Sequence, residues 1–394
     1  MARLKKTIAE NLQKQLSKHV YKTFGKPLTH SFECESLCES IKSNTKRDIG
    51  CNTVRRFLGF LQTEFSPSIK TLDILSEYAG FEDWYSFTQQ VSYAEYEPLS
   101  LDTEAQLYLK FYKINMQAEG DMNYHNACRN IALRILFNEA LLVKLAPLLA
   151  KLSVSQVYFF ERFPFIDGLG GAYKKSIQLY LQKKTDEAQI FGNNLLFLSA
   201  FLCENHKQIN TYHTRLNELP INESMHPFLI ARSIGSNILY ANYKQTDVSF
   251  WIAEAHKWNK YFLQKKYMNF WKYPYYTHMI CDYLNLAGYF QDSYQIIKTS
   301  DRNNEKFEIE EGYVEGLEVV SQIAKHPFFS SDQYLNWISA NDLFSNIHPL
   351  FKKYYELQAL KIKSSLLSKG KKREKVELRI SELVQQTGFV YFNK

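Results

Sequence analysis

The sequence lacks several patterns that mark common protein classes. Its six cysteines are spread over 394 residues without a Cys-x-x-Cys pair, which excludes a disulfide-rich scaffold and a zinc knuckle. No apolar run reaches the roughly 18 residues that a membrane-spanning helix needs. Residues 1–30 are basic but contain no continuous apolar stretch, so we expect no secretory signal. Together these absences favour a cytoplasmic protein that has no contact with a membrane.

Local signatures of catalysis are missing as well. Gly-x-Ser-x-Gly and His-Glu-x-x-His do not occur, and Glu223-x-x-His226 is a single copy where a di-iron bundle site needs two. The segment 167–171, Asp-Gly-Leu-Gly-Gly, followed by Lys174 and Lys175, has the composition of a phosphate cradle but not the Walker spacing. A turn between helices is the favoured interpretation. We therefore expect no enzymatic activity and no cofactor.

A metal site is also not expected. His30, Cys34 and Cys38 are spaced four apart, with Cys51 nearby, and four such ligands could hold zinc. Cysteines in this pattern more often pack as small core residues.

Charge is concentrated near the N-terminus. Residues 1–60 carry twelve Lys and Arg against five Asp and Glu, whereas residues 61–394 carry 36 of each sign, so the formal net charge of +7 falls within the first 60 residues. A concentrated basic segment attracts polyanions such as nucleic acid. A solvated basic surface without a partner is the alternative.

The hydrophobic pattern has a helical period almost throughout. In the first part of the chain it predicts five helices. The first covers residues 4–22, the second begins at Ser31 and buries Phe32, Leu37 and Ile41, and the third covers 53–61 with Asn52 as its cap. The fourth is capped by Ser66 and buries Ile69, and the fifth covers 81–91. Residues 154–160 and 388–392 are the strand-like exceptions. We predict an all-α protein with domains at residues 1–95 and 96–394.

The motif that indicates a function lies in the first domain. Residues 51–59 read Cys-Asn-Thr-Val-Arg-Arg-Phe-Leu-Gly, and residues 66–81 contain Pro67-Ser68-Ile69-x-Thr71-Leu72 and end in Gly80-Phe81. Residues 31–81 thereby resemble the helix-turn-helix domains of phage repressors, and similar segments occur in Bacteroidetes proteins with a long helical remainder. The chain has about six more residues between Ile41 and Thr53 than the family's short turn, which a longer second helix or a larger turn would absorb.

The resemblance implies that the helix near residue 52 reads double-stranded DNA. Short polar residues and arginines reach base edges, and lysines contact phosphates. The predicted DNA-binding residues are Asn52, Thr53, Arg55, Arg56, Lys42, Lys46, Arg47 and Lys70.

Residues 283–294, Tyr-Leu-Asn-Leu-Ala-Gly-Tyr-Phe-Gln-Asp-Ser-Tyr, resemble the junction between the two helices of a tetratricopeptide repeat (TPR). The second domain is therefore expected to be an antiparallel, TPR-like helical array with degenerate repeats. Residues 258–276 are rich in aromatics and lysines, which can line a peptide groove or stack on bases. The candidate ligand-binding residues in this stretch are Trp258, Tyr261, Lys265, Trp271 and Tyr275, with dense helix packing as the alternative.

These features lead to one main hypothesis and two alternatives. The main hypothesis is a homodimeric DNA-binding regulator whose helical array senses a peptide, a small molecule or a protein. One alternative is a protein-interaction scaffold with a vestigial helix-turn-helix domain. The other is a helical-repeat protein that binds single-stranded nucleic acid through the aromatic and lysine residues.

Overall fold

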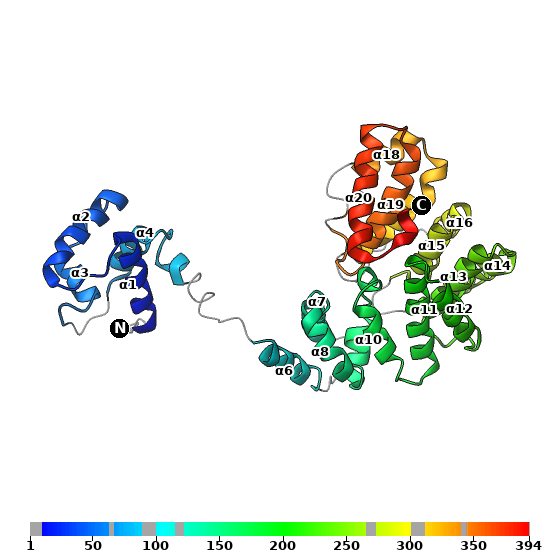
Figure 1. Ribbon diagram of the computed structural model, residues 1–394, viewed down its shortest axis with the longest axis horizontal. Coiled ribbons are helices and arrows are strands. Elements are labelled where there is room, and N and C mark those ends of the chain that lie inside the picture. The colour runs from blue at the N-terminus through cyan, green and yellow to red at the C-terminus, as the bar shows by residue number, and fades with distance from the viewer. Residues whose placement is uncertain are drawn as a thin grey trace. The chain divides into compact units, whose positions relative to one another are not determined.

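The computed structural model describes residues 10–62, 67–88, 100–114, 122–264, 273–300, 312–339, 344 and 346–393. These residues form helices and no strand, which confirms the all-α prediction. Their contacts divide the chain into unit 1, Met1–Ser100, and unit 2, Leu101–Lys394 (Figure 1). None of the described helices is both long and apolar enough to cross a bilayer.

Unit 1 contains α1 (Glu10–Phe24), a 3-10 turn η1 (Ser31–Glu33), α2 (Cys34–Thr45), α3 (Cys51–Phe57), α4 (Ile69–Tyr78) and a helical turn at residues 84–88. Helix α2 packs on both α3 and α4, and α1 packs on α4. The fully buried side chains of this core include Leu16, Leu37, Ile41, Val54 and Leu72. The six extra residues are absorbed in two ways, because α2 continues to Thr45 and a five-residue turn, 46–50, precedes α3.

Several expectations for unit 1 were wrong. The side chain of Phe32 is 68% exposed, because residues 31–33 form a 3-10 turn that is out of register with the buried stripe of α2. Ile69 is 59% exposed at the first position of α4. The cap of that helix is Ser68, whose hydroxyl accepts the Thr71 N–H at 3.2 Å, while Ser66 lies outside the described residues.

Unit 2 begins with α6 (Leu101–Phe111), α7 (Met122–Leu136), α8 (Glu139–Leu149), α9 (Ser153–Ser155), the π-helical η2 (Gln156–Glu161), η3 (Ile166–Gly168) and α10 (Tyr173–Tyr180). It continues with α11 (Asp186–Leu202), α12 (His206–Asn217), α13 (Pro227–Lys244), α14 (Ser249–Gln264), α15 (Tyr275–Ala287) and α16 (Phe290–Ser300). The last elements are α17 (Tyr313–Lys325), η4 (His326–Phe328), α18 (Ser331–Ser339), α19 (Lys352–Leu366), α20 (Lys371–Thr387) and η5 (Val390–Asn393). Residues 154–160 and 388–392, the strand-like stretches, are thus mainly helical.

Alternate helices of unit 2 form an inner layer. Helices α11, α13, α15, α17 and α19 pack on one another in that order, and the intervening helices pack on them from outside. The inner helices α11, α13 and α15 are buried along most of their length, whereas α12, α14 and α16 are buried on one side. At Gly235 an added Cβ would overlap the Tyr283 ring, so this glycine permits the close approach of α13 and α15.

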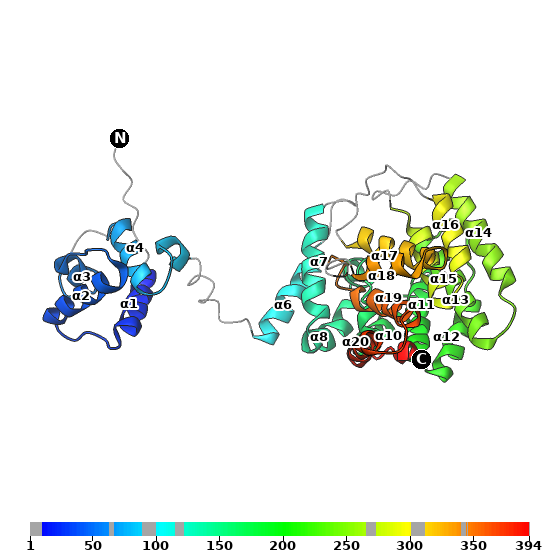
Figure 2. The same cartoon turned by 90° about the horizontal axis from the view of Figure 1, so that it is seen from above.

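The last helices of unit 2 return to its first ones. Helix α19 lies among α17, α18 and α20 (Figure 2). It also contacts η3, and η5 contacts α11. An added Cβ at Gly170 would overlap the carbonyl oxygen of Thr387. Gly170 of the glycine-rich turn therefore permits a close contact between two backbones.

Asp167 makes the most specific link in this closure. Its carboxylate oxygens accept the backbone N–H groups of Lys353 and Tyr354 at 2.8 and 2.9 Å, and its own N–H donates to Leu350 O at 3.0 Å. Asp167 thus caps α19, the first turn of which has no side-chain cap of its own. A carboxylate at a helix N-terminus satisfies free N–H groups and complements the helix dipole.

We expect Asp167→Ala to lower the free energy of unfolding of unit 2 by about 2–4 kcal/mol, because one buried and one partly buried N–H group would lose their acceptor. Urea unfolding followed by tryptophan fluorescence measures this change. Asp186→Ala, an exposed acid in the first turn of α11, is the matched control and should cost about 0.5 kcal/mol or less. Equal effects of the two substitutions would contradict the capping role.

Candidate functional site

The exposed surface of α3 is the candidate nucleic-acid interface of unit 1. Asn52 lies in the first turn of α3 and not at its cap, which is Gly50. Asn52 and Arg56 are exposed, four residues apart and therefore on one side of the helix, whereas Val54 and Phe57 face the core. Thr53 is half-buried.

The Arg55 side chain is held in place by hydrogen bonds within unit 1. Its guanidinium donates to the carboxylate of Glu35 at 3.0 Å, to the carbonyl oxygen of Ser31 at 3.1 Å and to the side chain of Asn52 at 3.1 Å. The side chain is 21% exposed. Arg55 thus connects α3 to η1 and α2, and its donors are engaged within the unit.

The other basic residues predicted to bind DNA differ in whether their side chains form hydrogen bonds or ion pairs within the unit. Lys42 pairs with Asp48 at 2.8 Å, and Arg47 pairs with Glu77 at 3.3 Å. Lys46 is exposed and donates to the carbonyl oxygen of Ser43 at 2.9 Å. The side chains of Arg56 and Lys70 are exposed and make no hydrogen bond or ion pair within the described residues. The freest cations are thus Arg56 and Lys70.

The charge of unit 1 as a whole differs from that of its first 60 residues. Residues 61–100 carry one Lys against seven Asp and Glu, so the unit holds thirteen basic and twelve acidic residues. Unit 2 holds the remaining 35 basic and 29 acidic residues. Any attraction of unit 1 for a polyanion therefore comes from a local face and not from its net charge.

The cysteines of α2 that were considered as zinc ligands are part of the core of unit 1. Cys34 and Cys38 are buried, and burial raises the pKa of the Cys38 thiol to about 12. Within the part of the chain that the structure describes, no group of three His, Cys, Asp or Glu side chains is arranged to hold a metal ion.

Unit 2 contains a cavity of about 790 Å³ that faces the inner layer of helices. Leu198 of α11, Leu229 of α13, Met279 of α15 and Tyr354 of α19 contribute to its wall. The volume lies within the usual range for small-molecule sites, about 300–1,000 Å³. Apolar and tyrosine side chains make up most of the lining, with a few charged groups among them.

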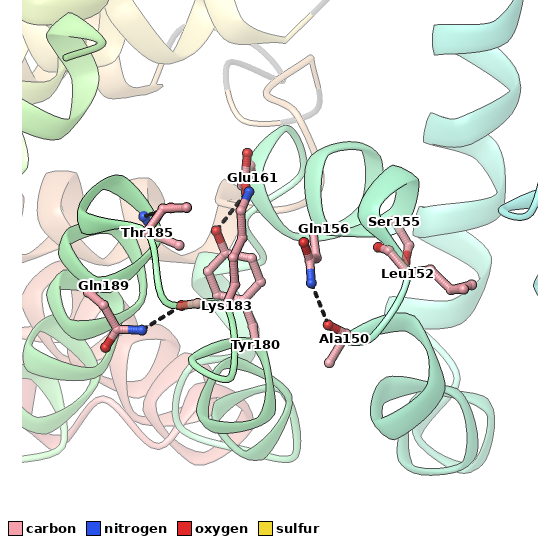
Figure 3. A network of polar contacts seen from close by, with 10 residues as sticks. Ala150, Leu152, Ser155, Gln156, Glu161, Tyr180, Lys183, Thr185 and Gln189 are labelled. Carbon is pink, nitrogen blue, oxygen red and sulfur yellow. Dashed lines mark hydrogen bonds and ion pairs between the residues drawn. The ribbon is translucent and has the colours of Figure 1, made fainter. Parts of the chain in front are cut away.

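One wall of the cavity holds a polar network near the start of α11. Glu161 accepts hydrogen bonds from the Tyr180 hydroxyl at 2.6 Å and from Lys183 Nζ at 2.7 Å (Figure 3). Gln189 donates to the backbone carbonyl of Lys183 at 2.6 Å and so holds the turn before α11. The charges of Glu161 and Lys183 compensate each other at this wall.

Two arginines line the same cavity without a carboxylate partner. Arg162 donates to His125 Nδ1 at 3.2 Å and lies over the Tyr158 ring, 4.6 Å from its centroid. Arg232 stacks over Phe228 at 4.4 Å. Within the described residues, neither guanidinium is in an ion pair.

His278 and Asp282, on consecutive turns of α15, are both buried at the cavity. The Tyr355 hydroxyl lies 2.7 Å from His278 Nε2, and Nδ1 lies 2.5 Å from the Tyr273 hydroxyl, which donates to the Tyr313 carbonyl oxygen at 2.9 Å. This series of hydrogen bonds places the proton of His278 on Nδ1 and leaves its imidazole neutral. Burial, together with the charge of Arg232, lowers the pKa of His278 to about 3.

Asp282 is engaged by neutral donors. Its carboxylate accepts from the Tyr354 hydroxyl at 3.1 Å and from Gln358 Nε2 at 2.8 Å. Burial raises the pKa of Asp282 to about 6, against the lowering effect of these donors and of Arg232.

The aromatic residues predicted to bind a ligand do not form one site. Tyr275 lines the cavity. Trp258 and Tyr261 are half-buried on α14, where they pack on each other and on Phe262, and neither is among the cavity-lining residues. Lys265 and Trp271 lie outside the described residues.

Sequence reasoning missed Arg162, Arg232, His278 and Asp282 as a group. A signal was present for two of them, because Arg232 and Asp282 are each the single charged residue within a long apolar stretch of their helices. Such a charge is costly to bury unless it has a function or a partner. Comparisons with protein-family models, with curated proteins and with solved structures found no match to this chain.

We expect His278→Gln to be less stable than the wild type at pH 7.5 and the difference to shrink as the pH falls. The folded pKa of His278 is depressed below its ordinary value of 6.5, so its contribution is complete above pH 6.5 and is lost as protons bind to the unfolded chain. The loss should reach about 1.4 kcal/mol per pH unit between pH 6 and pH 4.

Urea unfolding of both proteins at pH 7.5, 6.0, 5.0 and 4.5 tests this expectation. The difference between the two curves removes the contribution of Asp282, which both proteins share. Parallel curves over this range would show that His278 is not buried in its neutral form.

Proposed function

We propose that this chain is a DNA-binding regulator in which α3 of unit 1 contacts duplex DNA and unit 2 is a TPR-like helical array that receives an effector. The observation that carries the proposal is the exposed pair of Asn52 and Arg56 on the side of α3 opposite Val54 and Phe57. Asn pairs with adenine and Arg with guanine through two hydrogen bonds each in the major groove. Helix α3 follows α2 after the five-residue turn 46–50, which is longer than the family's turn, and takes the place of the reading helix in this proposal.

Phosphate contacts in this proposal come from the lysines around α3. Lys46 and Lys70 are exposed, and each phosphate contact adds salt-dependent affinity. Lys42 and Arg47 are held in exposed ion pairs with Asp48 and Glu77. Exposed pairs contribute only about 0–1 kcal/mol, so exchanging the carboxylate for a phosphate would cost little.

A homodimer is part of the same proposal. Several large apolar side chains of α6–α8 and the residues beside them are exposed, namely Leu107, Ile114, Phe137, Val143 and Leu148. A second copy would cover such residues. Two-fold symmetry would then require DNA half-sites about one helical turn apart.

A second candidate function, a protein-interaction scaffold, is favoured by the near-neutral charge of unit 1. Here the exposed aromatic residues Phe32 and Tyr85 of unit 1 would contact a protein partner, because exposed aromatics often anchor protein interfaces. The two candidates differ in whether the chain binds duplex DNA.

We expect Arg56→Ala to weaken binding to preferred duplex DNA about 10-fold or more, because one good base contact contributes about 1–3 kcal/mol. Fluorescence anisotropy with a random duplex pool and with DNA from upstream of the gene, at two salt concentrations, measures this change. Lys70→Ala should instead weaken both DNAs alike and reduce the salt slope by about 1.

Arg55→Ala and Arg215→Ala are the matched controls for Arg56→Ala. The first should lower the unfolding temperature of unit 1, since Arg55 bonds Glu35 and Ser31. The second removes an exposed arginine of unit 2 and should change neither property. If the wild type binds no DNA at low salt, the regulator proposal is refuted and the scaffold proposal remains. A pull-down would then test for a protein partner.

A further inference from the structure

Arg232 is the most unusual side chain in unit 2. It projects from α13, is 2% exposed and lines the 790 Å³ cavity. A guanidinium has five N–H donors, yet among the described residues Nε has no hydrogen-bond partner, and Nη1 reaches only the Tyr283 hydroxyl at 3.5 Å. The guanidinium also lies over the Phe228 ring, 4.4 Å from its centroid. A permanent positive charge is therefore buried with most of its donors unused.

Arg232 lowers the pKa of nearby Asp282, but within the described residues no carboxylate forms an ion pair with this charge. Asp282, which also lines the cavity, is bonded to Tyr354 and Gln358 and forms no ion pair with Arg232. Glu161, at the wall beside α11, is held by Tyr180 and Lys183. Burying an ionised group without a partner costs several kcal/mol of folding free energy. A buried arginine of this kind therefore indicates a binding role.

The rest of the cavity suits a molecule with one anionic group. A second guanidinium, Arg162, lines it and is hydrogen-bonded to the His125 ring. Phe191, Leu198, Leu229 and Met279 supply apolar surface, and Tyr273 and Tyr355 supply ring edges and hydroxyls. An apolar pocket with a few convergent polar groups is typical of small-molecule sites.

We propose that this cavity binds a small organic oxyanion, a carboxylate or phosphate joined to an apolar or aromatic body, whose oxygens pair with Arg232. The fork of N–H donors matches two oxygens of either group, and a charge-assisted pair of this kind is strong when it is shielded from water. Arg162 is the second contact for the ligand. The proposal stands on unit 2 alone and holds whether or not unit 1 binds DNA.

Two dyes of closely related shape test the proposal on the full-length protein. 1-Anilinonaphthalene-8-sulfonate is an aromatic oxyanion, and N-phenyl-1-naphthylamine is the same aromatic body without the sulfonate. We expect saturable binding of the anionic dye at one site per chain, at least about 10-fold tighter than binding of the neutral dye. Sodium benzoate and phenyl phosphate serve as competitors, and the better one identifies carboxylate or phosphate as the natural group.

Arg232→Met should weaken the anionic dye at least about 10-fold, leave the neutral dye unchanged, and keep or raise the unfolding temperature without ligand, since it removes an uncompensated charge. A merely structural arginine would lower that temperature. Arg162→Gln, nearer the surface, should weaken the anionic dye to a smaller extent and remains informative if the Met variant fails to fold. Arg215→Gln is the control, because this exposed arginine also lies over a tyrosine ring, 5.6 Å from Tyr212, but outside the cavity.

Three results would overturn the proposal. The first is equal affinity for the two dyes, and the second is unchanged binding of the anionic dye in both cavity variants. The third is the absence of saturable dye binding together with no thermal shift from benzoate or phenyl phosphate. None of these measurements involves DNA, so their failure and that of the proposed DNA binding are distinguishable.

Discussion

The capping of α19 by Asp167 is the interaction on which the closure of unit 2 depends. Helix α19 is buried over much of its length from Tyr354 onward, and its N-cap residue supplies no side-chain acceptor, so its free N–H groups need an acceptor from elsewhere in the chain. The acceptor comes from 186 residues earlier, in a turn whose Gly170 also contacts the backbone of Thr387. This link places Tyr354 and Tyr355 of α19 opposite α13 and α15. The wall of the cavity follows from that placement.

Within the cavity, charge and hydrogen bonding are unevenly matched. His278 and Asp282 have partners for their polar atoms, supplied by tyrosines and Gln358. Arg232, one helix away, has almost none. Among these three neighbours, only the cation has so few partners within the described residues, whereas ordinary core packing avoids unmatched charges. The contrast between these neighbours, more than the size of the cavity, indicates a site for an anion.

Unit 1 shows how similar residues take different roles through their contacts. Arg55 and Arg56 are adjacent in sequence, but helical geometry turns Arg55 toward α2 and η1 and leaves Arg56 in solvent. The acidic residues after position 60 nearly cancel the basic excess of the first 60 residues. An interaction with DNA would therefore depend on the shape and charge of one face, with unit 2 contributing most of the chain's net positive charge.

The sequence by itself determined the all-helical fold and much of the core of unit 1. Periodic apolar residues such as Leu37, Ile41 and Leu72 face inward because a helix repeats its contacts every three to four residues. Local patterns also indicated a turn between helices at 167–171, which begins within η3 and precedes α10. These properties depend on residues near one another in the chain, so a linear pattern contains them.

Only the tertiary structure decided which side chains share a site. Arg232, His278 and Tyr354 come from three separate helices and Arg162 from the end of η2, and no spacing in the sequence relates them. The same holds for the engagement of Arg55 by Glu35 and for the capping of α19 by Asp167. Contacts between distant segments depend on how whole helices pack, and packing is set by many side chains together. The character of the helices was therefore readable from the sequence, whereas the chemistry of the cavity arose from their assembly.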